Sequence, residues 1–261
     1  MNSEWFFTFF QGPFWAASRN AITPEMTEEE TDFLHAALSP PDNAALLDVP
    51  CGDGRLALSM AARGFQVTGV DRSDALLAKA RKRAGTTGLD VKWLDKDMRA
   101  LGRMGTFHGA WCMGNSFAYF DRQGTADFLA GVSQALKPGS RFVLDTNMAA
   151  ETVLVDFIER TWTQVDELLV LVEQEYQAGE GRLDTAYTVV QGGRRQTRKV
   201  SHWIFTVAEI RSLLQQAGLD TISLFSGVDQ LPFELGCPRL ILVAEKTGAR
   251  NHLPGKKKNV K

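Results

Sequence analysis

The stretch LDVPCGDGR, at residues 47–55, holds the residue types with the clearest capacity for chemistry. An apolar run leads into Gly52 and Gly54, Asp48 precedes these glycines, and Asp53 lies between them. Glycines let the backbone turn tightly and approach a ligand closely. This spacing after an apolar run therefore indicates a nucleotide-binding turn. The two acids make that turn negatively charged, which restricts the ligands that it suits.

A dinucleotide is the first ligand to consider. Residues 52–57 satisfy the pattern G-x-G-x-x-G/A, and Asp71 ends the next apolar run, where a ribose-binding acid is expected, so an NAD(P)-dependent oxidoreductase is an alternative. A dinucleotide, however, places its pyrophosphate on a helix N-terminus, where Asp48 and Asp53 would repel it. S-adenosylmethionine has no phosphate and carries a sulfonium and an ammonium. The acidic turn therefore favours S-adenosylmethionine.

Strands and helices alternate from residue 44 to residue 146. Five strands are predicted, at 44–49, 66–71, 91–94, 107–113 and 141–145. A helix is predicted from Ser73, as its N-cap, to Ala84, with Asp74 in the first turn and basic residues near the end, as the helix dipole prefers. Strands separated by helices predict a mainly parallel sheet that is covered on both faces.

The pattern changes between residues 161 and 206, where strands follow one another without helices. Glycine-containing turns at Ala178–Gly181 and Gln191–Arg194 join them as hairpins, which predicts an inserted antiparallel meander. A helix from Val207 to Ala217 then resumes the earlier pattern. The last two strands, 221–226 and 240–245, have no helix between them and should pair as a hairpin. The final strand of a seven-stranded sheet is thus predicted to be antiparallel.

The N-terminal segment is rich in aromatic residues and precedes a helix predicted at about 25–38. These residues are Trp5, Phe6, Phe7, Phe9, Phe10, Phe14 and Trp15. They could pack on the edge of the sheet, or they could form a mobile cover that supplies apolar walls for a substrate. The sequence leaves both interpretations open.

The overall composition excludes several classes of protein. With 29 basic and 31 acidic side chains, the chain lacks the basic surface expected of a nucleic-acid-binding protein. Three widely spaced cysteines make neither a disulfide framework nor a metal site, so we expect no metal and a reducing, cytoplasmic location. No apolar run reaches the roughly 18 residues of a membrane span, and residues 5–15 lack the basic start of a signal peptide.

Taken in order, these motifs resemble class I S-adenosylmethionine-dependent methyltransferases that act on small molecules. The family's first motif, an acid followed by glycines at alternate positions, is present as Asp48-Val-Pro-Cys-Gly52-Asp-Gly54, with Pro50 in place of the first glycine. Proline holds φ near −65°, so this position does not need a positive φ here. Leu136-Lys-Pro-Gly139 before the fifth strand also follows the family pattern.

The resemblance implies roles for the acids at the strand ends. It assigns Asp71 to the ribose hydroxyls and Asp97 to the adenine amino group, with Met98 lining the ring. Residues 112–117 would lie beside the methionine moiety and the methyl group. The cofactor-binding residues predicted in this way are Asp48, Pro50, Cys51, Gly52, Gly54, Asp71, Arg72, Asp97, Met98, Met113 and Asn115.

Each of these residues also has a purely structural interpretation. Asp48 and Asp71 could cap the helices that follow them, and Asp97 could be an exposed loop acid. Asn115 could satisfy backbone groups at the end of a strand. The cysteines, Cys51 among them, could be small buried hydrophobic residues near the pocket and not nucleophiles.

The resemblance predicts an α/β fold with a doubly wound, mainly parallel seven-stranded sheet, an inserted β-meander lid and an N-terminal helical and aromatic cap. The predicted units are a cap at 1–41, a Rossmann-like core at 42–148, a lid or substrate subdomain at 149–206, the rest of the core at 207–247, and a disordered basic tail at 248–261.

The expected activity is in-line methyl transfer to the oxygen or nitrogen of a small-molecule acceptor. Positioning and exclusion of water would supply most of the catalysis. His202 on the meander and Tyr119 after the fourth strand are the candidate catalytic residues, although His202 could equally be structural. A non-catalytic protein that binds S-adenosylmethionine is a further alternative. The sequence does not determine the acceptor or the oligomeric state.

Overall fold

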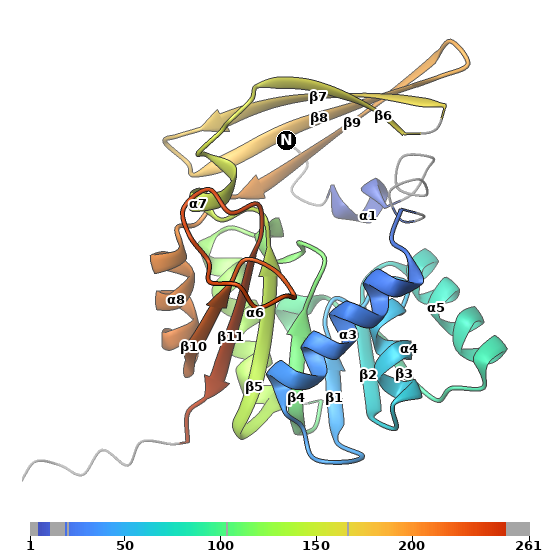
Figure 1. Cartoon of the computed structure of the whole chain (residues 1–261), viewed down its shortest axis with the longest axis vertical. Helices are drawn as coiled ribbons and strands as arrows, with labels where there is room; N and C mark the ends of the chain where they lie inside the picture. Colours follow the sequence, from blue (N-terminus) through green and yellow to red (C-terminus); the bar gives the residue numbers. More distant parts are fainter. Residues whose placement is uncertain (1–4, 11–18, 20, 103, 166, 249–261) are drawn as a thin grey trace, which may run out of the picture.

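A computed structural model describes residues 5–10, 19, 21–102, 104–165 and 167–248. The predicted basic tail after residue 248, together with Phe14 and Trp15, lies outside the described residues. Two β-sheets dominate the structure, and the long helices lie against the larger one (Figure 1).

The larger sheet has seven strands in the order β10-β11-β5-β4-β1-β2-β3. The strands are β1 (Ala45–Asp48), β2 (Gln66–Asp71), β3 (Lys92–Asp95), β4 (Phe107–Cys112), β5 (Leu136–Thr146), β10 (Leu219–Phe225) and β11 (Leu240–Lys246). Only β11 runs antiparallel to its neighbours, β5 and β10. The predicted fold class, including the antiparallel last strand, is confirmed.

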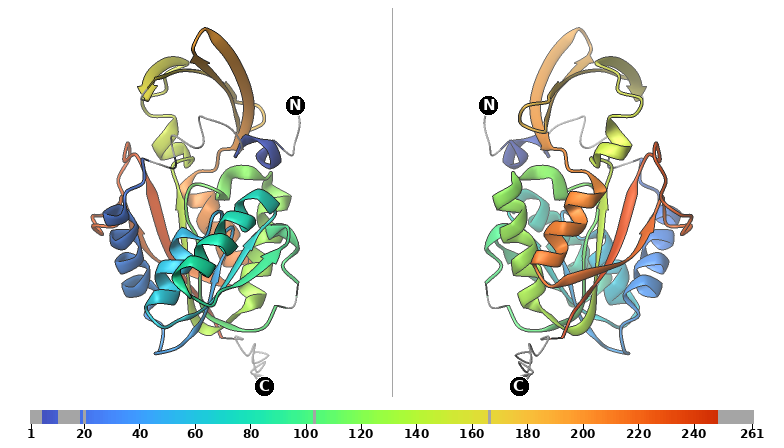
Figure 2. Two further views of the ribbon diagram at one scale, coloured as in Figure 1. Left: turned by 90° about the vertical axis from the view of Figure 1, so that its right-hand side faces the viewer. Right: turned by 90° about the vertical axis from the view of Figure 1, so that its left-hand side faces the viewer.

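Helices cover both faces of this sheet, as Figure 2 shows. The long helices are α3 (Pro24–Leu38), α4 (Arg55–Ala62), α5 (Asp74–Thr87), α6 (Arg122–Ala135) and α8 (Val207–Gln216), and the short ones are α1 (Phe6–Phe9), η1 (Met98–Ala100), η2 (Phe117–Tyr119) and α7 (Ala150–Val153). One core cluster joins α3 and α4 to the sheet, and another joins α6 and α8 to it. Adjacent residues Leu46 and Leu47, both fully buried, belong to different clusters because successive strand residues point to opposite faces.

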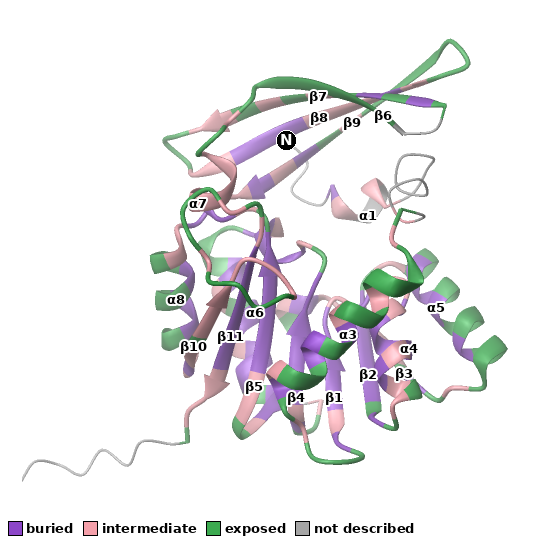
Figure 3. Cartoon of the chain, in the orientation of Figure 1, coloured by how far each residue is buried: buried purple, intermediate pink, exposed green. Residues whose placement is uncertain are grey.

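The second sheet is the predicted meander, with antiparallel strands in the order β6-β7-β8-β9. Its strands are β6 (Arg160–Val165), β7 (Leu168–Gln177), β8 (Arg182–Gln191) and β9 (Arg194–Trp203). In Figure 1 it lies beyond the same end of the large sheet as α1. Figure 3 shows a continuous buried interior in the large sheet and only scattered buried residues here. Burial alternates along β7, where Val170 is buried and Leu171 is exposed.

Two elements extend beyond their predicted bounds by three or more residues. Helix α5 continues past Ala84 to Thr87 and ends where Gly88 adopts a left-handed conformation, with φ of 68°. Strand β5 begins at Leu136, five residues before the predicted start, since Leu136 already pairs with Phe107 of β4. The domain boundaries drawn from the sequence stay a prediction.

Candidate active site

A cavity lies at the carboxyl ends of β1, β2 and β4, and residues from α1 and η2 form part of its wall. Nearly all of the predicted cofactor-binding residues line it: Asp48, Pro50, Cys51, Gly52, Asp71, Arg72, Asp97, Met98 and Met113. Gly54 and Asn115 do not line it. Of the two candidate catalytic residues, Tyr119 lines the cavity and His202 does not.

The glycine turn is held by its own backbone hydrogen bonds. The backbone N–H of Cys51 donates to the carbonyl of Val70 (2.8 Å), and that of Gly54 donates to the carbonyl of Cys51 (3.0 Å). The N–H of Gly52 donates to Oδ2 of Asp71 (2.8 Å). These three N–H groups are thus engaged within the protein and are not free to bind a pyrophosphate.

The close packing between α4 and β3 requires a glycine at position 54. Its φ is +78°, and a Cβ built on it would lie 2.4 Å from Cη2 of Trp93 on β3. Such a distance is well inside van der Waals contact, so only glycine fits between α4 and β3. Gly54 therefore shapes the turn from behind the cavity wall.

Asp71 is anchored by two backbone groups. Its Oδ1 accepts from the N–H of Ser73 and its Oδ2 from that of Gly52, each at 2.8 Å. Burial raises the pKa of Asp71, while these N–H donors oppose the shift. The N-cap of α5 is Ser73, whose hydroxyl accepts from the backbone of Leu76, so Asp71 is not itself that cap. A carboxylate oxygen has two lone pairs, so Asp71 can still accept from hydroxyl groups in the cavity.

Asp48 is a buried acid at the end of β1. Only 3% of its surface is exposed, and burial raises its pKa well above the ordinary range, while the nearby Arg55 opposes the shift. A low-dielectric environment disfavours the charged form of a carboxyl group. A cation bound in the cavity beside Asp48 would lower its pKa again.

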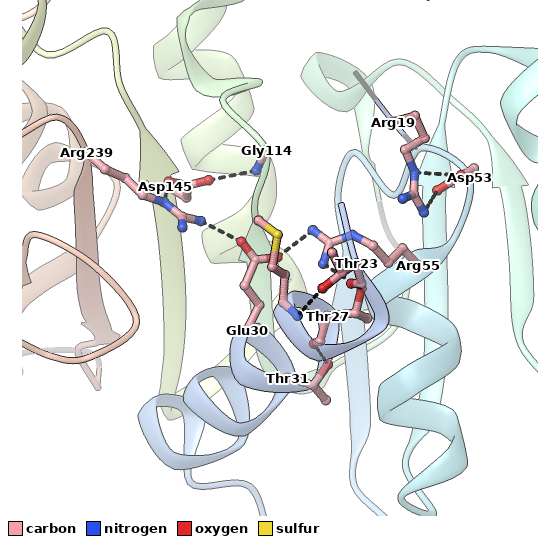
Figure 4. Close-up of polar contacts among 11 residues, drawn as sticks. Arg19, Thr23, Thr27, Glu30, Thr31, Asp53, Arg55, Gly114, Asp145 and Arg239 are labelled. Carbon is pink, nitrogen blue, oxygen red and sulfur yellow. Dashed lines mark hydrogen bonds and ion pairs between the residues drawn. The ribbon is translucent and has the colours of Figure 1, made fainter. Parts of the chain in front are cut away.

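Asp53 is not the unpaired acid assumed from the sequence. Its carboxylate accepts from Nε and Nη2 of Arg19 (2.8 and 3.0 Å) and from Nη1 of Arg83 (3.0 Å), as Figure 4 shows for Arg19. Two guanidinium groups balance this charge, so Asp53 adds little negative potential to the cavity. The sequence argument for an acidic turn therefore needs correction for Asp53, and for Asp48 it depends on a bound cation that favours the charged carboxylate.

Asp97 is the N-cap of η1 and is paired with Arg99. Its Oδ1 accepts from the backbone N–H and Nε of Arg99 (2.8 and 3.0 Å), and its Oδ2 accepts from Nη2 (2.6 Å). Hydrogen bonds from Arg99 lower the pKa of Asp97. The same guanidinium lies 4.5 Å from the centre of the Phe120 ring, which lines the cavity. Asp97 is thus a fixed carboxylate at the cavity and not a free loop acid.

The segment after β4 separates into residues that line the cavity and residues that do not. Met113, Gly114 and Ser116 line it. The side-chain oxygen of Asn115 instead accepts from Oγ1 of Thr146 and from the backbone N–H of Asn147, both at 3.0 Å. This is the structural interpretation of Asn115, and its predicted role in cofactor binding has no support from its position.

Two of the described N-terminal aromatics reach the cavity, and one of them, Phe6, also packs against a core cluster of the large sheet. Phe6 and Phe10 line the cavity together with Tyr119 and Phe120. The rings of Phe6 and Tyr119 are stacked at 5.7 Å, and the indole N–H of Trp5 donates to the backbone of β9 at the carbonyl of Ser201 (2.9 Å). The segment thus joins the meander to the cavity wall.

The two candidate catalytic residues lie close together, Tyr119 on η2 at the cavity wall and His202 on β9 outside the cavity. The hydroxyl of Tyr119 is 3.3 Å from Oγ of Ser116, and burial raises the pKa of Tyr119, so it remains a phenol. His202 is 6% exposed, with its ring 5.0 Å from that of Trp5 and 6.0 Å from that of Tyr119. Burial lowers the pKa of His202 to about 4. An efficient general base has a pKa near the working pH, so His202 is a weak base in this environment.

Several cavity residues were not found from the sequence, including Arg19, Arg55 and Lys96. Arg55 could have been found, because it directly follows Gly54 at the first position of α4. Arg19 had no such signal, since its partner Asp53 is 34 residues away.

Burial raises the pKa of both Cys51 and Cys112, which agrees with a packing role for these thiols. Within the described ranges, no set of three or more His, Cys, Asp or Glu side chains is arranged to hold a metal ion. None of the helices described is long and apolar enough to cross a membrane.

Comparison with known proteins is consistent with this geometry. Residues 46–139 match the family model of a methyltransferase domain. The putative methyltransferase YqeM of Bacillus subtilis is 26% identical over 73% of this chain and 78% of its own length. An S-adenosylmethionine-dependent methyltransferase from Clostridium acetobutylicum has a similar structure, with a TM-score of 0.78, 18% identity, and coverage of 90% of this chain and 97% of that one. The amino pentose methyltransferase CalS10 of Micromonospora echinaspora, solved with S-adenosylmethionine bound, has a TM-score of 0.69, 22% identity, and coverage of 92% and 99%.

Proposed function

We propose that this chain, which is an S-adenosylmethionine-dependent methyltransferase of class I fold, methylates an oxygen or nitrogen of a small molecule bound against the cavity wall that α1 and η2 form. The observation that carries this proposal is a shared cavity. The aromatic wall of Phe6, Phe10, Tyr119 and Phe120 encloses the same space as the loops after the core strands. An apolar wall beside a cofactor site suits a small organic acceptor.

The residues present fit the cofactor. The buried Asp48 suits a cationic ligand, and the N–H groups of Cys51, Gly52 and Gly54 are already engaged within the protein. In the proposed arrangement, Asp71 holds the ribose hydroxyls and Asp97 with Met98 holds the adenine. Met113 and Gly114 contact the methionine moiety. When bound, the cofactor supplies a methyl group already activated on a sulfonium.

Arg19 is the proposed partner of the cofactor's carboxylate. It lines the cavity and lies against Asp53 of the first motif, 16% exposed. A guanidinium can bind two carboxylates at different N–H groups, so Arg19 can keep Asp53 while it binds a second anion. The oxidoreductase alternative is not favoured.

Catalysis is proposed to depend on orientation and on exclusion of water. Trp5 and Phe6 join the meander to Tyr119, so the acceptor would be enclosed by aromatic rings on one side. Low water content helps an uncharged nucleophile attack a cationic carbon, because charge disperses in that step. We assign Tyr119 to contact with the acceptor. We propose that His202 has a structural role, in which its ring packs against the rings of Trp5 and Tyr119.

Binding and turnover can be tested separately. Calorimetry should show that S-adenosylhomocysteine binds the wild-type chain and that NADH does not. Methyl transfer should then be assayed with a panel of amines, amino sugars and phenols, because neighbours of this fold include an amino pentose methyltransferase. NADH binding at the same cavity would contradict the cofactor. Transfer only to a protein or nucleic acid would contradict the acceptor class.

Variants of Tyr119 refine the test. Tyr119→Phe keeps the ring that stacks on Phe6 and removes the hydroxyl, whereas Tyr119→Ala removes both. If the ring wall matters most, the alanine variant loses turnover at least tenfold more than the phenylalanine variant, with S-adenosylhomocysteine affinity retained in both. Equal losses would assign the effect to the hydroxyl.

A further inference from the structure

Four charged side chains from four different segments form a continuous chain of ion pairs beside the cavity (Figure 4). Asp145 lies near the end of β5, Arg239 directly precedes β11, Glu30 is on α3, and Arg55 begins α4. Nε of Arg239 donates to Oδ1 of Asp145 (2.6 Å), and its Nη2 donates to Oε1 of Glu30 (2.9 Å). The other Glu30 oxygen, Oε2, is 2.5 Å from Nη2 of Arg55.

Both ends of this chain reach the cavity wall. At one end, Oδ2 of Asp145 accepts from the backbone N–H of Gly114 (2.8 Å), and Gly114 lines the cavity after β4. At the other end, Arg55 lines the cavity beside the glycine turn. Glu30 and Arg239, in the middle, do not line it. The two walls are therefore connected through residues that lie outside the cavity.

The four charged side chains are largely shielded from solvent, which favours one fixed arrangement of their contacts. The side chains are 5% (Asp145), 14% (Glu30), 15% (Arg55) and 29% (Arg239) exposed. Burial alone would lower the pKa of Arg239, but the carboxylates of Asp145 and Glu30 raise it above its ordinary value. Charges alternate along the chain, two acids with two guanidinium groups, so no charge is left unbalanced. Partly buried pairs of this kind fix orientation strongly, because an unpaired partner would be costly.

We infer that Glu30 and Arg239 are positioning residues for the cofactor, which hold the Gly114 wall and the Arg55 wall at the separation that the ligand needs. Arg239 orients the carboxylate that receives the Gly114 N–H. Glu30 fixes Arg55 with one carboxylate oxygen and binds Arg239 with the other, so it links the two guanidinium groups. Because the peptide unit is planar, holding the Gly114 N–H also sets the direction of the Met113 carbonyl. The inference rests on the cofactor site proposed above.

Binding of S-adenosylhomocysteine to single and double variants tests this inference. Glu30→Gln and Arg239→Gln should each weaken binding by about tenfold to a hundredfold, since small displacements of positioning groups have effects of this size. The double variant should bind no more weakly than the worse single variant, because both changes break one chain. Arg239→Lys keeps a cation that can pair with only one carboxylate at a time, so its affinity should be intermediate.

A matched control exists at the other end of the same strands. Arg141 of β5 pairs with Glu245 of β11 (3.5 Å) and donates to the carbonyl of Ala37 on α3 (3.0 Å), but it does not line the cavity. Arg141→Gln should leave the affinity for S-adenosylhomocysteine unchanged. Its melting temperature, measured beside those of the other variants, separates loss of stability from loss of positioning.

The outcomes are distinct. Wild-type affinity in Glu30→Gln and Arg239→Gln would overturn the inference. So would additive losses in the double variant, or an equal loss in Arg141→Gln. No binding of S-adenosylhomocysteine by the wild-type chain would instead overturn the proposed cofactor site. Weakened binding in both chain variants, with melting temperatures no lower than that of Arg141→Gln, would support positioning.

Discussion

Arg19 holds both carboxylate oxygens of Asp53, which lies 34 residues later in the chain, with contacts of 2.8 and 3.0 Å at the wall of the cavity. The pair joins the segment before α3 to the glycine turn. It also balances the charge of a residue that otherwise makes the turn more acidic. The electrostatic character of the site therefore depends on a residue outside every motif.

We expect Arg19→Gln to weaken binding of S-adenosylmethionine by about tenfold, because a cavity-lining cation and a tether are lost together. The free energy of unfolding should also fall, by roughly 1–2 kcal/mol, since Asp53 keeps only the half-exposed Arg83. The double variant Arg19→Gln with Asp53→Asn removes the unpaired carboxylate. Chemical denaturation should show that this double variant regains stability, and calorimetry should show that it does not regain affinity. Recovered affinity would mean that Arg19 only neutralises Asp53 and does not contact the cofactor.

Gly54→Ala should abolish cofactor binding and destabilise the fold. The new Cβ would meet Trp93 at 2.4 Å and would force a residue with φ of +78° to adopt a strained conformation. Gly64→Ala is the matched control, because φ there is +91° but no atom lies within 4 Å of the new Cβ. The control should cost only about 1–2 kcal/mol of left-handed strain. Thermal melts should rank Gly54→Ala clearly below it, and equal melting temperatures would contradict the close packing on Trp93.

Asp48→Asn should stabilise the protein at high pH and weaken cofactor binding. The pKa of Asp48 is raised by folding, so the native state binds its proton more tightly than the unfolded state does. Its contribution to stability is therefore present at low pH and is lost as the pH rises through the native pKa. The melting temperature of the variant relative to wild type should increase from pH 5 to pH 9. A pH-independent difference would show that folding does not raise the pKa of Asp48 into this pH range.

His202 should make the protein sensitive to acid. Its pKa is lowered from 6.5 to about 4 in the native state, so the unfolded state binds the proton first. Above pH 6.5 the stabilising contribution is complete, and it is lost as the pH falls towards 4, by about 3 kcal/mol in all. In His202→Phe this loss should be absent. Urea unfolding at intervals between pH 4 and pH 7 measures the difference between the two proteins, and parallel curves would contradict the shift.

Local patterns in the sequence were sufficient for most of the fold. Alternating apolar runs, Ser73 at a helix start and the glycine turns at 178–181 and 191–194 act over a few residues, so they mark elements without tertiary information. Even the antiparallel β11 followed from the missing helix before it. The acids at or just past the ends of β1, β2 and β3 could also be placed beside one cavity, because the carboxyl ends of parallel strands meet at one edge of the sheet.

The sequence by itself thus determined the α/β order, the inserted meander and the cofactor class, because short-range periodicity and glycine spacing encode them. Only the tertiary structure decided which side chains neutralise one another. It paired Arg19 with Asp53, turned Asn115 towards Thr146, and buried His202 behind Tyr119. These outcomes depend on contacts between residues about 30 to 80 positions apart. A one-dimensional pattern carries no information about the distance or direction of such a contact, whereas folding sets both.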